Sequence, residues 1–333
     1  MRPDDPRDAA PRGQAARRRD HSVPLFEGRD SRRHVRRSLW RLRLEAALAA
    51  WRSRPELEDA RTLVQFAGWP RSGHSLIGAL IDAHPEAVIA HELDAMGLFH
   101  KGVPARRLPL HCAGNAARFT ASGRHWNGFA YAVPEAPHGP RGRPRVVGDK
   151  KGDWATRWAA ADPDLTRRLA AESPLLCRWI LVTRHPADNI ATMSLRRGGA
   201  YDRLRISGAD DVSGGIRRAQ AAGEVASEID DGALADYRAL TAAVAQMKAR
   251  VPAENWIEIV YERFAAAPEA ELERLAAWLG LSADPEWRDA AAAMVRSGGG
   301  RSRDRLSWRD DQRQAVAGMI AANDFFEVYC DEI

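Results

Sequence analysis

The sequence predicts an α/β fold in which helices flank a doubly wound parallel sheet. Short apolar runs that are typical of buried strands alternate along the chain with longer stretches of helical period. The predicted strands are residues 61–67, 88–90, 146–148, 179–182 and 255–260. Strands that alternate with helices favour a parallel sheet, because the chain crosses one face of the sheet between successive parallel strands.

The composition fits one sizeable α/β core, alone or with an appendage. The chain has 333 residues, of which 45% are hydrophobic. Its cysteines, Cys112, Cys177 and Cys330, lie far apart, form no metal-ligand spacing and cannot all pair, which favours a reducing, cytoplasmic location. No run of about 18 apolar residues occurs, and the basic residues 17–19 precede no apolar core. We therefore expect neither a transmembrane span nor a signal peptide.

Residues 1–54 are predicted to form a basic, partly disordered N-terminal extension, and residues 55–333 the main domain. Residues 1–30 show no period, whereas residues 31–52 have the pattern of a basic amphipathic helix. The net charge of the chain is +5, and much of the positive excess lies in this extension. An arm for nucleic acid or an anionic membrane stays open. A solvated tail is favoured, because aromatic residues are almost absent from the extension.

The most informative segment is the turn between the first strand and a helix predicted over residues 75–83. The apolar run of the strand stops at Gly68 and Pro70, and the apolar residues after Ser75 fall on one helical face. A tight turn of this kind directs backbone N–H groups and the positive end of the helix dipole at one point. The turn therefore predicts an anion-binding site.

The spacing of this turn is that of a nucleotide phosphate loop with one change. It is Gly68-x4-Gly73-x-Ser75, which makes the predicted fold P-loop-like. His74 stands in place of the lysine that contacts the β- and γ-phosphates, and Arg71 supplies a cation from within the turn. The turn is thus a phosphate-type cradle without the usual lysine.

The turn resembles the 5′-phosphosulfate loop of sulfotransferases, which use 3′-phosphoadenosine 5′-phosphosulfate (PAPS). Residues 70–75, PRSGHS, match the family's Pro-Arg/Lys-Ser-Gly-Thr-Thr, and residues 80–85, LIDAHP, are similar to the Leu-Leu-Asp-Ala-His-Pro of the bacterial and protein-tyrosine branch. The resemblance implies a PAPS-dependent sulfotransferase that needs no metal. It also implies that the loop binds the donor through Arg71, Ser72, Gly73, His74 and Ser75.

A second candidate donor contact follows the strand at residues 179–182. Arg184 lies at the end of this strand, and Thr192 lies eight residues later on a helix predicted over residues 188–195. A guanidinium and a hydroxyl that converge there suit two oxygens of a phosphate. The family places an arginine and a serine at this spacing, so the resemblance implies that Arg184 and Thr192 bind the 3′-phosphate of PAPS. A capped helix with a surface arginine is the alternative.

His91 and Glu92 follow the strand at residues 88–90 and are the candidate bases. Transfer to an alcohol requires its hydroxyl to lose a proton, and a carboxylate at a strand end is suited to accept it. The tyrosine-sulfating branch has a glutamate at this place, so the resemblance implies that Glu92 is the base. His91, which titrates nearer neutrality, stays an alternative, as does a purely structural ion pair of Glu92.

Lys150 is the fourth candidate catalytic residue, beside Glu92, His91 and Arg71. Residues 148–151, GDKK, resemble the family's Asp-Lys-Thr-Pro segment, whose lysine approaches the bridging oxygen of the leaving group. Gly152 stands where the proline usually is, so Lys151 stays an alternative to Lys150. The alternative without a catalytic role is that the two residues are a pair of surface lysines.

Residues 96–145 are predicted to be an irregular insertion on the acceptor side. The segment is rich in Pro, Gly, His and Arg, and its Trp126, Phe129 and Tyr131 suit a sugar, a phenol or a lipid headgroup. We therefore expect a small-molecule, glycan or lipid acceptor and no nucleic-acid partner.

The rest of the chain carries weaker signals. Residues 198–215 are irregular, and residues 216–249 predict one long helix. A further helix is predicted over residues 269–279, and residues 260–264 and 275–281 resemble family stretches that we interpret as packing. Arg301, in the basic loop 298–303, is expected to close over the nucleotide, with a disordered linker as the alternative.

The predicted reaction is in-line transfer of a sulfuryl group from PAPS to a hydroxyl or amine. A P-loop kinase of small molecules stays open, although the histidine at position 74 and the lack of an acidic strand end for Mg²⁺ oppose it. A non-catalytic nucleotide- or RNA-binding descendant of the fold also stays open, and the basic N-terminus is its best support.

Overall fold

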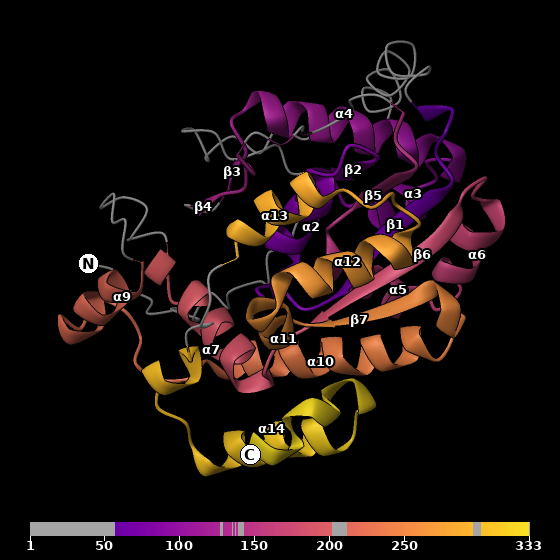
Figure 1. Ribbon diagram of the computed structural model, residues 1–333. Helices are drawn as coiled ribbons and strands as arrows, with labels where there is room; N and C mark the ends of the chain where they lie inside the picture. The colour runs from indigo at the N-terminus through magenta and orange to yellow at the C-terminus, as the bar shows by residue number, and fades with distance from the viewer. Residues whose placement is uncertain are drawn as a thin grey trace, which may run out of the picture.

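The computed structural model describes residues 57–126, 129–134, 136, 138, 143–201, 212–295 and 301–332. Its centre is a parallel sheet of five strands in the order β2-β5-β1-β6-β7, which confirms the predicted fold class (Figure 1). The strands are β1 (Thr62–Gly68), β2 (Ala87–Ala90), β5 (Val146–Asp149), β6 (Leu176–Thr183) and β7 (Trp256–Val260). Each has its predicted counterpart, because strands covered on both faces are continuous apolar runs.

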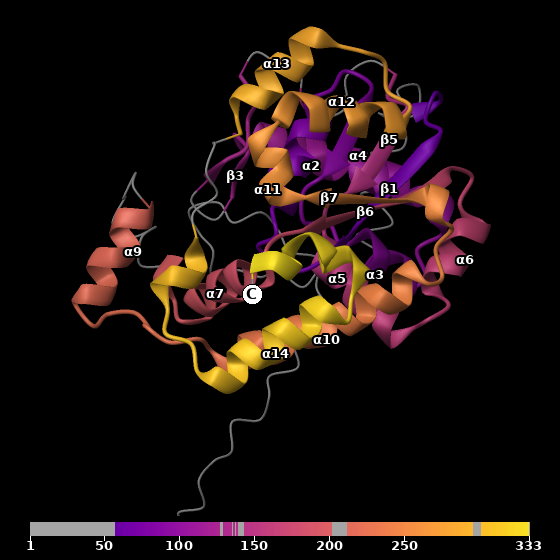
Figure 2. The same ribbon diagram turned by 60° about the horizontal axis from the view of Figure 1, so that its bottom comes forward.

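The side chains of β1 alternate between two hydrophobic cores, one on each face of the sheet. Leu63 and Ala67 belong to one core, and Val64 and Phe66 belong to the other. The helices that contribute to the first core include α3 (Ala95–His100), α5 (Gly152–Ala161), α6 (Leu165–Glu172), α7 (Pro186–Arg197), α10 (Asp231–Lys248) and α14 (Asp310–Ala321). Those of the second are α2 (His74–Asp82), α11 (Tyr261–Ala266), α12 (Pro268–Leu279) and α13 (Pro285–Ala293). Figures 1 and 2 show these two helical layers with the sheet between them.

The strand order brings the carboxyl ends of all five parallel strands to one edge of the sheet. β1 is the central strand, between β5 and β6, and the chain first crosses to β2 and β5 and then back to β6 and β7. In open α/β sheets, ligands bind outside the carboxyl ends of the strands, near the point where the chain reverses its direction across the sheet. The turn that follows β1 lies at this point.

The single helix predicted over residues 216–249 is wrong, because the structure has two helices there. α9 (Val212–Ala221) is followed by Gly223, whose φ is 68°, and α10 begins at Asp231. The carboxylate of Asp230 caps α10 by accepting a hydrogen bond from Ala233 N–H at 2.6 Å. Gly223 and the Asp230 cap separate the two helices, although the helical spacing of apolar residues continues across them.

Residues 96–145 contain more regular structure than the irregular insertion that their composition predicts. They include η2 (Ala105–Arg107), α4 (Leu108–Ala121) and the hairpin of β3 (His125–Trp126) and β4 (Phe129–Ala130). Ala113 and Ala116 of α4 pack against Val88 of β2. Because the residues at this contact are small and Pro109 lies in the first turn, α4 has no large apolar face, and the sequence pattern did not predict it.

Further helices, α5, α6, α13 and α14, were not expected from the sequence, and neither were η3 (Ala253–Asn255), η4 (Ser302–Arg305) and η5 (Asp324–Glu332). The disorder predicted for residues 1–30 and the helix predicted for 31–52 lie outside the described residues, as do 202–211 and 296–300. Within the described part of the chain, no helix is long and apolar enough to cross a membrane.

Candidate active site

The turn after β1 has the backbone of an anion cradle. Gly68 and Gly73 have φ angles of 121° and 113°, and Arg71 also has a positive φ of 72°. A Cβ atom at position 73 would lie 2.6 Å from the ring of Tyr261, so only glycine fits there. The turn ends at the first residue of α2, whose backbone N–H groups point out of the helix N-terminus.

Contacts from behind hold this turn in place. Gly68 N–H donates to Thr156 Oγ1 of α5 at 2.8 Å, and the buried indole of Trp69 donates to Thr241 Oγ1 of α10 at 3.2 Å. Ser72 Oγ donates back to the carbonyl of Trp69 at 3.0 Å. Ser72 is therefore part of the turn's own structure, and its backbone N–H is the group that it offers to a ligand.

His74 faces away from the cradle. Its Nε2 lies 2.9 Å from the carbonyl of Ala67, and a Cβ atom on Gly152 would lie 2.5 Å from its Cε1. Burial, reinforced by the charge of Lys150, lowers the pKa of His74 to about 4. The imidazole is thus neutral, and the hydrogen bond to Ala67 places its proton on Nε2. The side chain of His74 is therefore part of the structure of the turn, and donor binding by His74 stays a prediction.

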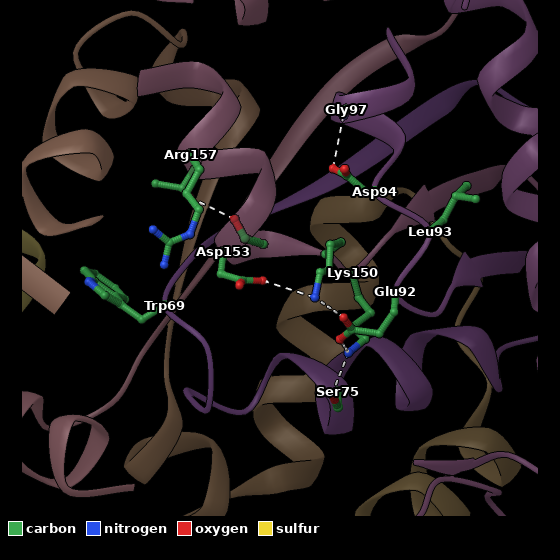
Figure 3. A network of polar contacts seen from close by, with 12 residues as sticks. Trp69, Ser75, Glu92, Leu93, Asp94, Gly97, Lys150, Asp153 and Arg157 are labelled. Atoms are coloured by element: carbon green, nitrogen blue, oxygen red, sulfur yellow. Dashed lines mark hydrogen bonds and ion pairs between the residues drawn. The ribbon is translucent and has the colours of Figure 1, made fainter. Parts of the chain in front are cut away.

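Glu92, Lys150 and Ser75 meet at the open side of the turn (Figure 3). The ammonium of Lys150 contacts one carboxylate oxygen of Glu92, that of Lys151 contacts the other, and Lys150 Nζ also donates to Ser75 Oγ at 2.7 Å. Burial favours the neutral acid, but the two ammonium groups hold the pKa of Glu92 well below its usual range. Glu92 is therefore a carboxylate at physiological pH.

The two lysines of this network have different surroundings. Lys150, which is 3% exposed, reaches the turn through Ser75, and its burial lowers its pKa. Lys151 lies 3.6 Å from Asp153, and the charges of Asp153 and Glu92 outweigh its burial and raise its pKa. Of the two, Lys150 is the lysine that contacts the cradle.

Asp149, to which the sequence reasoning gave no role, holds the turn that carries Glu92. Its carboxylate accepts hydrogen bonds from Leu93 N–H at 3.2 Å and from Ala95 N–H at 2.8 Å. Within this turn Glu92 and Asp94 both have positive φ angles, 58° and 64°. Because burial penalises the charged form, the pKa of Asp149 is raised to about 7.

Arg184 and Thr192 lie together at the end of β6. Arg184 Nη1 is 3.3 Å from Thr192 Oγ1, and Arg184 Nη2 is 3.4 Å from Ser302 Oγ of η4. The Arg184 guanidinium also lies 5.8 Å from the centre of the Tyr261 ring. The guanidinium of Arg184 and the hydroxyl groups of Thr192 and Ser302 thus converge beside the turn. The sequence analysis had singled out Arg184 and Thr192, but not Ser302.

The basic segment at Arg301 is ordered against α7 from Ser302 onward. Arg303 N–H donates to Asp188 Oδ1 at 2.8 Å, and Ser302 meets Arg184. Arg301 itself is exposed, and the polar contacts that η4 makes with α7 among the described residues come from Arg303, through Asp188. The predicted closure of Arg301 over a nucleotide stays a prediction.

His91 is packed among aromatic rings beside the network of Glu92, Lys150 and Ser75. Its ring stacks on Phe119 with centroids 4.0 Å apart and lies 5.3 Å from Trp126 and 5.6 Å from Tyr131. It is 2% exposed, and burial lowers its pKa well below the usual value. A neutral, stacked imidazole of this kind is a wall of the site, whereas the carboxylate of Glu92 lies in the network with Ser75 and Lys150.

Tyr261, Ser302 and Asp149 are residues around the turn to which sequence reasoning gave no functional role, whereas it had placed Tyr131 on the acceptor side. Tyr261 is the first residue after β7, so its position at a strand end was a usable signal. The others depend on contacts between distant segments, which no local pattern reveals.

Comparison with known proteins identifies the family. A family model described as "Sulfotransferase family" matches residues 64–285. No curated protein matches the chain significantly. Solved structures that resemble it include sulfotransferase STF1 from Mycobacterium tuberculosis H37Rv, with 12% identity, a TM-score of 0.44 and coverage of 83% of this chain and 82% of that one.

Two further structures have comparable scores. A sulfotransferase from Alicyclobacillus acidocaldarius is 17% identical with a TM-score of 0.41, and covers 82% of this chain and 96% of its own. Mouse sulfotransferase SULT7A1, in complex with PAP, is 12% identical with a TM-score of 0.40, and covers 87% and 94%. The family match itself starts in β1, ends at the first residue of α13 and spans well over half of the 333 residues. The chain therefore belongs to the sulfotransferase family.

Proposed function

We propose that this sulfotransferase moves a sulfuryl group from PAPS to a hydroxyl, or an amine, of a small-molecule, glycan or lipid acceptor. The observation that carries the proposal is the contact of Lys150 with both Ser75 of the turn and Glu92. A cation for the leaving oxygen and a carboxylate for the acceptor proton thus lie side by side at the mouth of an anion cradle.

The residues present fit PAPS as the donor. The backbone between Gly68 and Ser75 has the positive φ angles of an anion cradle, and Arg71 Nε is buried with no hydrogen-bond partner among the described residues, as expected for a group that awaits one. Arg184 and Thr192 form a second anion contact beside the cradle. Two anion contacts match a ligand with a 5′-phosphosulfate and a separate 3′-phosphate.

The chain's residues would act mainly by position and charge. Backbone N–H groups of residues 72–75 and Arg71 hold the phosphosulfate. Glu92 takes the proton of the acceptor hydroxyl as its oxygen bonds to sulfur. The bond between sulfur and the bridging oxygen breaks, and Lys150 donates a hydrogen bond to the phosphate oxygen that leaves. When Lys150 turns to that oxygen, Glu92 loses one of its two cations and becomes a stronger base.

The residue at position 74 does not support the alternative function, a P-loop kinase. The residue in the place of the P-loop lysine is a neutral imidazole hydrogen-bonded behind the turn, so it offers no cation to β- and γ-phosphates. His91, the alternative base, is stacked on Phe119.

Transfer of label tests the proposal. The wild-type enzyme is incubated with PAPS labelled in the sulfate and a metabolite extract of the source organism. We expect label in an organic product, and no transfer of the γ-phosphate from Mg-ATP in a parallel reaction. Phosphate transfer without sulfate transfer would establish the kinase instead.

A further inference from the structure

Two lysines hold Glu92, one at each oxygen of its carboxylate. Lys150 contacts Oε1 and Lys151 contacts Oε2, and Lys151 Nζ also lies 3.6 Å from Asp153 Oδ1. In Figure 3 the dashed contacts lead from Asp153 through Glu92 to Ser75. The proposed reaction gives Lys150 a new partner, the leaving oxygen, but it assigns no role to Lys151.

Lys151 is attached to helix α5, whereas Lys150 reaches the turn after β1. Lys151 is the N-cap residue of α5, and its carbonyl accepts a hydrogen bond from Ala155 N–H at 3.0 Å. Asp153, which contacts its ammonium, lies in the first turn of the same helix. Lys150 Nζ instead donates to Ser75 Oγ of the turn at 2.7 Å. Of the two lysines, Lys150 is therefore the one placed to move to a bound donor, and Lys151 is the one placed to stay at Glu92.

A bound donor makes it harder to keep Glu92 ionised. PAPS is anionic, and a nearby negative charge favours the protonated form of a carboxyl group. When Lys150 turns to the leaving oxygen, Glu92 faces an anionic sulfuryl group with one cation fewer. The Glu92 side chain is only 12% exposed, so water offsets little of this charge. A carboxylate in these surroundings needs a cation that stays with it if it is to act as a base.

The neighbouring titratable groups do not supply this cation. Those that face Glu92 beside the two lysines are His91, His74, Tyr131 and Asp149. Burial lowers the pKa of both histidines and raises the pKa of Tyr131, so all three are neutral at neutral pH. Burial also raises the pKa of Asp149 to about 7, so this group is either neutral or negative. The cations in contact with Glu92 among the described residues are thus the two lysines.

We propose that Lys151 is a positioning residue for the base: it stays on Glu92 Oε2 while Lys150 leaves Oε1 for the leaving oxygen, so that Glu92 remains a carboxylate until it takes the acceptor proton. The inference rests on the proposed function, because it concerns the proton transfer of the same site. It also assigns the proton to Oε1, the oxygen that Lys150 vacates. The O–H bond of the acceptor hydroxyl breaks, an O–H bond forms at Oε1, and the acceptor oxygen keeps the electron pair with which it bonds to sulfur.

The variant Lys151→Met tests this role, because methionine keeps an unbranched side chain and removes the charge. The initial rate of label transfer from PAPS into the metabolite extract is measured at saturating PAPS between about pH 5 and pH 9. Loss of the cation raises the pKa of Glu92, so less of the base is ionised at a given acidic pH and the rate falls there. We expect the acidic limb of the profile to move to higher pH by at least about 1 unit, with the rate near pH 8 within about threefold of the wild-type rate.

A titration that needs no turnover gives a second readout. The enzyme is labelled with ¹³C at the carboxyl carbons of its glutamates, and its complex with 3′-phosphoadenosine 5′-phosphate (PAP) is titrated by NMR. The signal of Glu92 is the one that Glu92→Gln lacks. PAP offers its 5′-phosphate to Lys150, so Glu92 then depends on Lys151. The titration midpoint of Glu92 should rise in Lys151→Met and return in Lys151→Arg, which restores the charge.

Lys248→Met is the matched control. Lys248 also joins two carboxylates, Glu258 at 2.7 Å and Asp324 at 2.8 Å, but these lie in β7 and η5, outside the candidate site. Its replacement should leave the pH profile and the Glu92 signal unchanged. Lys151→Gln removes the same charge with a polar side chain and takes the place of Lys151→Met if that variant does not fold.

Three results would count against the proposal in different ways. An acidic limb that stays in place when the charge of Lys151 is removed overturns the role of Lys151. A rate that falls by the same factor at every pH also overturns it, and shows that Lys151 supports the structure of the site instead. If the wild-type enzyme binds PAP but transfers no label, the proposed sulfuryl transfer fails, and the role of Lys151 in it fails too, even where the midpoint of Glu92 moves.

Discussion

The ring of His74 occupies the space beside Gly152, at the point where the chain enters α5. Both residues depart from the sulfotransferase motifs, which have a threonine at the first position and a proline at the second. One contact explains both departures, because any side chain at position 152 would overlap the imidazole. The two substitutions are therefore coupled, although 78 positions in the sequence separate them. Sequence reasoning treated them as two separate weaknesses of the motif match.

This coupling predicts a non-additive pair of variants. Gly152→Ala should lower the free energy of unfolding by about 1–3 kcal/mol, because the new Cβ displaces the His74 ring. In a His74→Ala background the same change should be neutral or stabilising by up to about 1 kcal/mol, since alanine favours the helix more than glycine does. Urea unfolding of the four proteins in the cycle measures the coupling. Equal effects in both backgrounds would contradict the contact.

A single substitution tests whether Glu92 is the general base. Glu92→Gln keeps the shape of the carboxylate and removes the proton acceptor. Transfer to an alcohol should fall by about 10²- to 10⁴-fold, whereas affinity for PAP should hardly change. Steady-state rates and calorimetry measure the two quantities, with His91→Gln as the comparison. Loss of turnover in His91→Gln together with its retention in Glu92→Gln would transfer the role to the histidine.

Asp149 makes a pH-dependent contribution to stability. Its pKa in the folded protein, about 7, is above its ordinary value of 3.8, so the folded state holds its proton more tightly than the unfolded state does. The resulting stabilisation is complete below pH 4 and is lost as pH rises through 7. The free energy of unfolding of the wild type, minus that of Asp149→Asn, should fall by about 4 kcal/mol between pH 4 and 8. A difference that stays flat would show that Asp149 is already ionised at low pH.

At the scale of elements, four of the five parallel strands are each followed, just beyond the carboxyl end, by a residue of the candidate site. Glu92 follows β2, Lys150 follows β5, Arg184 follows β6 and Tyr261 follows β7. The sequence predicted the first three, because a buried parallel strand is a continuous apolar run and its end is easy to find. The acceptor-side hairpin could not be predicted, because the ion pair of Arg124 with Asp82 that fixes it joins segments that are distant in sequence.

The arginine after β6 is expected to bind ligand and not to support the fold. Arg184→Ala should weaken PAP binding by about 2–3 kcal/mol, the scale of a charge-assisted hydrogen bond in a buried site. The thermal midpoint of the free enzyme should hardly change, and calorimetry gives the affinity. Arg167→Ala, which removes an exposed arginine of α6 whose ion pair among the described residues is the local one with Asp164, should change neither quantity. A variant at position 184 that unfolds, or that binds PAP normally, would show a structural role.

At the scale of the whole molecule, the two large hydrophobic cores lie on opposite faces of one sheet, and the proposed donor contacts lie in loops and helices beyond the carboxyl ends of its strands. A nucleotide bound there would contact the turn after β1, the end of β6 and η4, which are brought together only in the folded chain. A ligand with this requirement binds the folded state alone. It therefore stabilises the whole protein by mass action.

PAP at about 100 times its dissociation constant should stabilise the folded protein by about 2.7 kcal/mol. For a domain of this size, that corresponds to a rise of roughly 4 °C in the thermal midpoint. Adenosine 5′-phosphosulfate, which lacks the 3′-phosphate, should do much less at the same concentration, because it leaves Arg184 and Thr192 without their anion. In Arg184→Ala the advantage of PAP over adenosine 5′-phosphosulfate should largely disappear. Equal shifts of the wild-type midpoint with both nucleotides would remove Arg184 and Thr192 from the donor site while leaving the turn after β1 within it.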